Sequence, residues 1–144
     1  MISETWYSEI ESTIFTHLAF ELCEKTGAPY PELTCTTSSQ NDNIEGVAVF
    51  PTLYIHLLPP MEIGNTLLND DVTAIRATFE VEVFSDNSES ECRKIITSCI
   101  QEMKKLHFNV QMFPDPQTND KKYFAIARFN RVIAGGDSDI VPRE

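Results

Sequence analysis

Residues 75–83 carry the sequence IRATFEVEV, and this stretch decides the fold. Its residues alternate between apolar (Ile75, Ala77, Phe79, Val81, Val83) and polar (Arg76, Thr78, Glu80, Glu82). Because successive side chains of a strand point to opposite faces, this period of two predicts a β-strand. One of its faces is expected to be buried, and the other to meet water or another subunit.

A helix is predicted directly after the turn that follows this strand. Ser88 and Glu91 have the spacing of a capping box, in which each side chain satisfies a free backbone N–H at the helix start. His107 stands where the helix ends, and we expect it to take the left-handed position that glycine usually fills. The apolar stripe of this helix, at spacings of three and four, consists of Cys92, Ile95, Ile96, Cys99, Met103 and Leu106.

A second amphipathic helix is expected near the N-terminus. Ser3 or Thr5 can serve as its N-cap, and the Gly- and Pro-containing segment 27–31 ends it. Its apolar stripe consists of Tyr7, Ile10, Ile14, Leu18 and Leu22, with Phe15 beside them. We expect this helix to pack on a sheet as well.

Further strands are predicted on both sides of the central one. Their ranges are 33–37, 52–58, 109–113 and 123–133. The order helix, strands, helix, strands predicts a single α+β domain over residues 1–144. Its sheet is expected to have four to five mainly antiparallel strands, with two helices packed on one face.

Four segments are predicted to lie outside these elements. Residues 38–43 and 114–120 are polar and predict loops, and residues 135–144 predict a flexible polar tail. Residues 61–71 predict a loop that carries four apolar side chains: Met61, Ile63, Leu67 and Leu68. Such side chains need cover, either from their own domain or from a partner.

The composition limits the possible functions. The 144 residues carry a formal charge of −11, which argues against binding nucleic acid through clustered Lys and Arg. We expect no signal peptide and no membrane contact, because the N-terminus lacks an apolar core and no run of about 18 apolar residues occurs. The four widely spaced cysteines are expected to be reduced and buried.

The sequence offers no reactive constellation, so we expect neither an enzyme nor a cofactor. The three histidines have no metal-binding spacing, and a phosphate-binding glycine motif is absent. Glu80 and Glu82 share a strand face and resemble an acid/base pair. A catalytic pair needs a cleft that separates its two pKa values, so a face that meets solvent or another subunit is the better interpretation.

The linear pattern resembles the tail-completion (tail-terminator) proteins of long-tailed, siphovirus-like bacteriophages and prophages. The resemblance spans residues 50–133. It is carried by Phe50-Pro51, by the strand from Phe79 to Phe84 with its Ser85-Asp86-Asn87 turn, by the capped helix ending Leu106-His107-Phe108, and by Ala125–Phe129. The chain departs from the family pattern at His107, where glycine is usual, and at Ala125, where an aromatic residue is common.

The resemblance implies a structural virion protein with no catalytic residues. Such proteins form a ring, commonly of six subunits, at the head-proximal end of the tail tube. The ring ends tube growth and joins the tail to the head-side connector, after assembly in the host cytoplasm. The implied partners are copies of the chain, the tail tube protein and the connector, with DNA only passing through the lumen. An acidic lumen would let that DNA slide without sticking.

A closed ring needs two different surfaces on each copy. The candidate interface residues come from the polar face of the central strand and from the apolar loop: Arg76, Thr78, Glu80 and Glu82 with Met61, Ile63, Leu67 and Leu68. Two alternatives stay open. One is a head-side stopper or adaptor protein, and the other is a small cellular hydrolase or ligand-binding domain.

Overall fold

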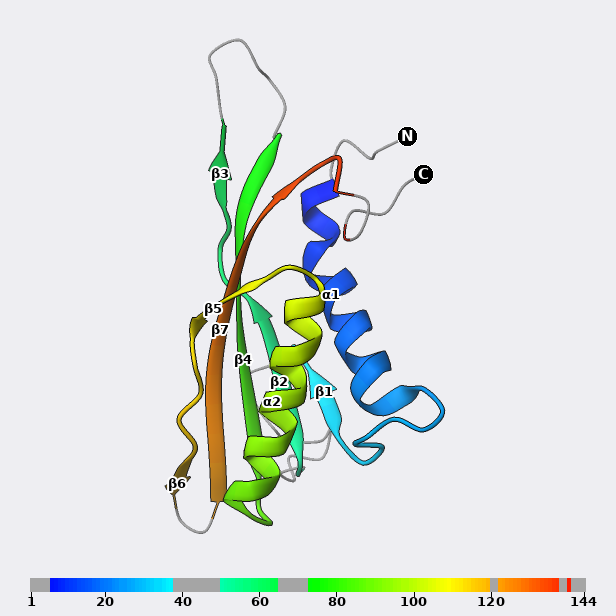
Figure 1. Ribbon diagram of the computed structural model, residues 1–144, viewed down its shortest axis with the longest axis vertical. Coiled ribbons are helices and arrows are strands. Elements are labelled where there is room, and N and C mark those ends of the chain that lie inside the picture. The colour runs from blue at the N-terminus through cyan, green and yellow to red at the C-terminus, as the bar shows by residue number, and fades with distance from the viewer. Residues whose placement is uncertain (1–5, 38–49, 65–72, 120–121, 138–139, 141–144) are drawn as a thin grey trace.

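Two long antiparallel strands form the centre of the protein in the computed structural model, which describes residues 6–37, 50–64, 73–119, 122–137 and 140. They are β4 (Ala74–Ser85) and β7 (Lys122–Ala134). The two strands pair along the whole length of β4, from Ala74 opposite Ala134 to Ser85 opposite Tyr123. Figure 1 shows the pair as the spine of an elongated domain. The strand predicted from residues 75–83 is confirmed.

Five shorter strands extend the sheet on either side of this pair. β2 (Thr52–Leu57) and β3 (Met61–Ile63) share one edge of β4, and β5 (Asn109–Met112) and β6 (Gln117–Asn119) share one edge of β7. β1 (Thr34–Thr36) pairs with β2 in parallel. The sheet therefore has seven strands and is mixed, whereas four to five were predicted. The difference arises because two edges are each filled by two short strands.

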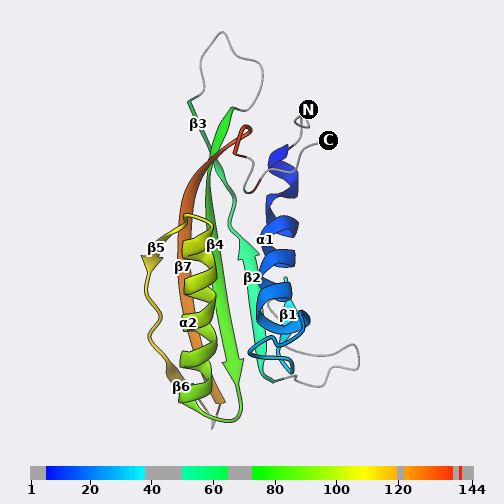
Figure 2. The same ribbon diagram turned by 45° about the vertical axis from the view of Figure 1, so that its right-hand side comes forward.

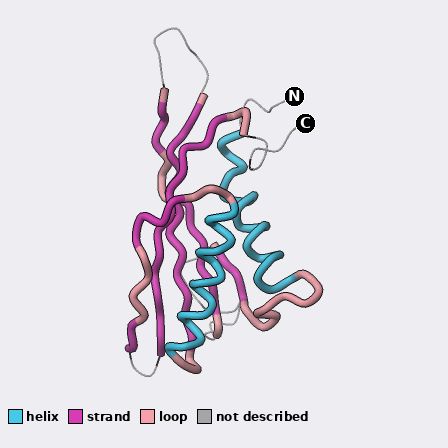
Figure 3. The backbone as a smooth tube through the Cα atoms, viewed as in Figure 1, coloured by secondary structure: helices cyan, strands magenta, loops and turns pink. Residues whose placement is uncertain are grey.

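Both helices pack on one face of the sheet, as predicted (Figure 2). The N-terminal helix runs from a 3-10 turn, η1 (Trp6–Glu9), through α1 (Ile10–Ala19) to a π-helical turn, η2 (Phe20–Glu24). The second helix is α2 (Glu89–Lys105). Figure 3 shows both helices crossing the same side of the strands.

The core lies between the helices and the predicted apolar face of β4. All five apolar residues of that face are at most 4% exposed, as are the first five residues of the α2 stripe. The Phe79 ring meets the Phe108 ring edge to face, with centroids 5.7 Å apart. Such contacts add to the free energy of burial. In the first helix, Trp6 is buried and Tyr7 is exposed. The prediction that Tyr7 lies on the buried stripe is wrong.

The ends of α2 differ partly from the prediction. Ser88 Oγ accepts a hydrogen bond from the Glu91 N–H at 3.0 Å, as expected for a cap. The Glu91 carboxylate does not return to the Ser88 N–H but accepts hydrogen bonds from Ser85 Oγ at 2.7 Å and Asn87 Nδ2 at 3.3 Å. It therefore ties the helix to the turn. His107 has a φ of 66°, which confirms its left-handed position.

The predicted flexible tail contains a packed residue. Ile140 is 3% exposed and belongs to the core. Gly135 lies against the Trp6 ring so closely that a Cβ there would stand 3.0 Å from Trp6 Nε1. The Asp137 carboxylate accepts a hydrogen bond from the Ala134 N–H at 2.8 Å. Polar composition predicted fraying over 135–144, but these contacts hold the described residues of the segment, 135–137 and 140, on the domain.

The predicted loops differ from the structure in two places, and other predictions cannot be compared with it. The predicted loop at 61–71 is wrong for Met61–Ile63, which form β3, and the predicted loop at 114–120 contains β6. The proposed N-caps Ser3 and Thr5 and the loop 38–43 lie outside the described residues.

Candidate functional site

The face of β4 opposite the helices is the open face of the sheet. Arg76 is exposed there, and Thr78, Glu80 and Glu82 are half-buried beside it. None of the described helices covers this face (Figure 2). The four residues predicted to share one strand face therefore do so.

Glu80 is neutralised within the sheet. Its cross-strand neighbours are His56 on β2 and Arg128 on β7. The Arg128 guanidinium donates to the Glu80 carboxylate from Nε at 2.9 Å and lies 2.8 Å from it through Nη2. Two contacts from one guanidinium to one carboxylate oxygen hold both side chains across the strands.

Glu82 has a different environment on the same face. Its cross-strand neighbours are Tyr54, which is 9% exposed, and Ile126. Glu82 makes no hydrogen bond or ion pair with any described residue. Burial, followed by the nearby Glu80 carboxylate, raises the pKa of Glu82. Glu82 is therefore a half-buried carboxylate that lacks a counterion within the described chain.

Glu82 lines an open hollow at the lower end of the sheet. The hollow has a volume of about 330 Å³. Lys122 stands at its rim, with Nζ 5.2 Å from the centre of the Phe50 ring, which is within cation–π range. We call this site the aromatic hollow, and its principal lining residues are Glu82, Phe50, Phe84, Phe124 and Ile126.

A second hollow extends the first toward β5. Its volume is about 170 Å³, and it shares Phe124 and Ile126 with the aromatic hollow. Met112 and Phe113 lie along it, 39% and 70% exposed. Apolar surface thus continues from the centre of the sheet to its β5 edge, which is typical of a surface that binds another protein.

A separate apolar patch with a positive charge lies at the other end of the open face. Met61 on β3 and Val132 on β7 flank Arg76 in register, and they are 67% and 46% exposed. Arg76 forms no hydrogen bond or ion pair with the residues that the structure describes. We call Met61, Arg76 and Val132 the β3 patch. Of the other predicted interface residues, Ile63 is half-buried, and Leu67 and Leu68 lie outside the described residues.

The described residues show neither a cluster suited to a metal ion nor a thiol of lowered pKa. Within these ranges no cluster of three or more His, Cys, Asp or Glu could hold a metal ion. Burial raises the pKa of Cys92 to about 11 and that of Cys99 to about 12. Burial likewise raises the pKa values of Cys23 and Cys35. These shifts are opposite to the shift that activates a nucleophilic thiol.

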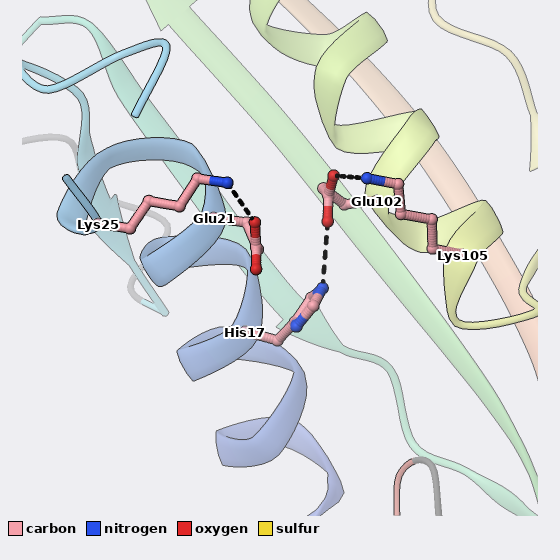
Figure 4. A network of polar contacts seen from close by, with 5 residues as sticks. All are labelled: His17, Glu21, Lys25, Glu102 and Lys105. Carbon is pink, nitrogen blue, oxygen red and sulfur yellow. Dashed lines mark hydrogen bonds and ion pairs between the residues drawn. The ribbon is translucent and has the colours of Figure 1, made fainter. Parts of the chain in front are cut away.

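Polar contacts on the helical side of the sheet include one that joins the two helices. Figure 4 shows His17 of α1 pointing to Glu102 of α2, with Nε2 3.3 Å from Oε1. Lys105 donates to the same carboxylate at 2.9 Å, while Glu21 pairs with Lys25 at 2.8 Å. Of these contacts, the one between His17 and Glu102 connects the two helices, and the other two lie within one helical segment each.

Comparisons with known proteins assign no family. No protein-family model matches the chain, and no curated protein matches it at the significance required. Among the described helices, none combines the length and apolar character needed to cross a membrane.

The apolar part of the open face is absent from the predicted interface. In β7 the open-face residues begin with Phe124 and Ile126, while the opposite face holds Ala125, Ala127 and Phe129. Both faces of this strand are therefore apolar at one end. Phe84 likewise ends the polar series of β4 with an aromatic ring. Apolar residues at these positions, where alternation would place polar ones, are the sequence signal of the hollow.

The half-buried environment of Glu82 predicts how the stability of the protein depends on pH. When the pKa of a carboxyl is higher in the folded chain than in the unfolded chain, ionisation of that carboxyl lowers the free energy of unfolding. For Glu82 this loss of stability begins as the pH rises through the ordinary carboxyl pKa of 4.5. We expect Glu82→Gln to raise the free energy of unfolding at pH 7 and to have little effect below the ordinary carboxyl pKa. Urea unfolding of the monomer at both pH values measures this.

The matched control is Glu80→Gln, which removes a carboxylate from the same face. Because Glu80 is paired with Arg128, we expect this variant to be less stable than the wild type at pH 7. A Glu82→Gln protein that is also less stable at pH 7 would contradict the environment described for Glu82.

Proposed function

We propose that this chain is a structural protein that assembles with copies of itself into a ring at the head-proximal end of a bacteriophage tail tube. The observation that carries the proposal is the open face of the sheet. It exposes apolar surface, and it carries two charged groups, Arg76 and Glu82, without counterions among the described residues.

The arrangement of the open face supports assembly into a closed ring. The β3 patch and the aromatic hollow are different surfaces, and they lie at opposite ends of one face. When each copy uses its two patches on two different neighbours, the contacts are heterologous, and they generate a ring if the rotation closes. A two-fold dimer would instead pair both patches with both patches of a single partner, which leaves neither patch for a further copy.

The specific place in the virion follows from the resemblance of residues 50–133 to tail-terminator proteins. The ring would end growth of the tail tube and bind the tube protein on one side and the head-side connector on the other. DNA would pass through the lumen, where the net charge of −11 disfavours tight phosphate binding. Glu80 and Glu82 are poor candidates for the lumen charge, since Arg128 neutralises one and the hollow surrounds the other.

Removing the gene from the phage that encodes the chain tests the proposal. We expect tails of abnormal length that do not join to heads, and restoration of normal tails when the chain is supplied from a plasmid. Tails of normal length with heads that lose their DNA would favour the head-side stopper. Normal, infectious particles would contradict both assignments.

A further inference from the structure

The open face carries two opposite charges that cannot meet within one copy. Arg76 and Glu82 lie on the same face of β4, separated by 82 − 76 = 6 residues. At about 3.3 Å per residue, this places their backbones about 20 Å apart, which is more than the two side chains can span. Each lacks an ion-pair partner among the described residues. A counterion for either one must therefore come from outside the described chain.

The neighbours of Glu82 cannot supply that counterion. Arg128, the nearest guanidinium along β7, is held by Glu80 at 2.8 Å. Lys122 lines the same hollow, but its ammonium lies over the Phe50 ring. The attraction between this carboxylate and a cation becomes stronger when the cation enters the hollow and excludes the remaining water.

The apolar surroundings of the two charges are also complementary. Arg76 stands between Met61 and Val132, both of which expose large parts of their surface. Glu82 stands among aromatic rings in a hollow of about 330 Å³. A methionine side chain is flexible and its sulfur contacts aromatic rings favourably. An arginine side chain also packs well against aromatic faces.

We infer that the β3 patch of one copy docks into the aromatic hollow of the next copy, so that Arg76 pairs with Glu82 across the interface. The occupant is a second copy of this chain, because the missing cation and apolar side chains are those that the chain itself exposes. The inference rests on the proposed function and adds the contact by which neighbouring copies recognise each other. In a closed ring every patch is docked and every hollow is filled.

Charge reversal tests this pairing. Sedimentation velocity at low salt, with and without isolated tail tubes, compares wild type, Arg76→Glu, Glu82→Arg and an equal mixture of the two variants. Each variant alone is expected to associate at least about 30-fold more weakly, since breaking a desolvated charge pair costs this much or more. The mixture is expected to recover. In it, the two substituted side chains form an ion pair of reversed polarity at one interface, and the wild-type pair forms at the alternate interface.

Matched controls separate this effect from general changes in charge. Arg93→Glu and Glu89→Arg make the same reversals on the exposed side of α2, and they are expected to associate like the wild type. Thermal unfolding of each variant verifies its fold. If Glu82→Arg does not fold, Glu82→Lys takes its place in the mixture. Arg76 is exposed, so Arg76→Glu serves as the folded single variant in either case.

The outcomes distinguish the docking contact from the proposed function. Single variants that assemble as well as the wild type overturn the contact and leave the ring intact. Folded variants that are weakened but do not recover when mixed overturn the pairing of Arg76 with Glu82. A wild-type chain that stays monomeric even with tail tubes overturns both.

Discussion

Replacing Phe79 by alanine is expected to lower the free energy of unfolding by about 3–5 kcal/mol. Phe79 is fully buried at the centre of β4, and its ring meets Phe108 from the end of α2. The substitution removes the ring and leaves a cavity between the sheet and the second helix, which the surrounding packing can close only in part. Chemical denaturation, followed by circular dichroism, measures the change.

Phe84→Ala is the matched control, because Phe84 lies on the same strand but on the open face. Its ring lines the aromatic hollow, so we expect a loss of only about 1 kcal/mol in the monomer together with weaker association between copies. Equal losses of stability in the two variants would contradict the assignment of one face to the core and the other to assembly.

Ile140→Ala is expected to lower the free energy of unfolding by about 2–4 kcal/mol. Ile140 is 3% exposed and packs in the core, close to the end of the chain. Without it, residues 135–137 would lose their apolar anchor and keep mainly polar contacts, such as the Gly135 N–H with the Thr73 carbonyl and Asp137 with Arg131. Thermal or urea unfolding measures the loss.

Val132→Ala serves as the control for Ile140→Ala, since Val132 is 46% exposed on the open face. We expect its effect on the monomer to stay within about 0.5 kcal/mol. An Ile140→Ala protein as stable as this control would show that the C-terminal segment contributes no packing, as its polar composition alone suggests.

The regular elements could be predicted from the sequence because their periods are clear. The alternation through Val81 predicted β4, and the spacing from Cys92 to Met103 predicted α2 and its buried side. His107 was correctly placed in the left-handed region, because a helix that ends without glycine needs some residue there. In each case local chemistry and tertiary packing favour the same structure.

The edge strands and the tail could not be predicted in the same way. β3 and β6 are each three residues long, too short for a period to be detected, and they form because β4 and β7 extend beyond their longer partners. Trp6 rather than Tyr7 faces the core because the chain enters the helix through a 3-10 turn, which rotates its first residues relative to the α-helical stripe.

The candidate site was predicted only in its polar half. The alternation of one strand places Arg76 and Glu82 on a shared face, but the aromatic half comes from three separate segments. Phe50, Phe84 and Phe124 are far apart in the sequence, and strand register brings the last two opposite each other. Contacts between distant segments leave no period in the sequence, so only the fold shows that Glu82 lines the hollow.

Electron cryomicroscopy of phage tails assembled in the presence of this chain tests the proposed ring most directly. The account predicts a closed ring of copies at the head-proximal end of the tube, with the open face of each copy covered by its neighbour and Met61 of one copy beside Phe124 of the next. Tails without the chain, or copies whose open face is left to solvent, would contradict it.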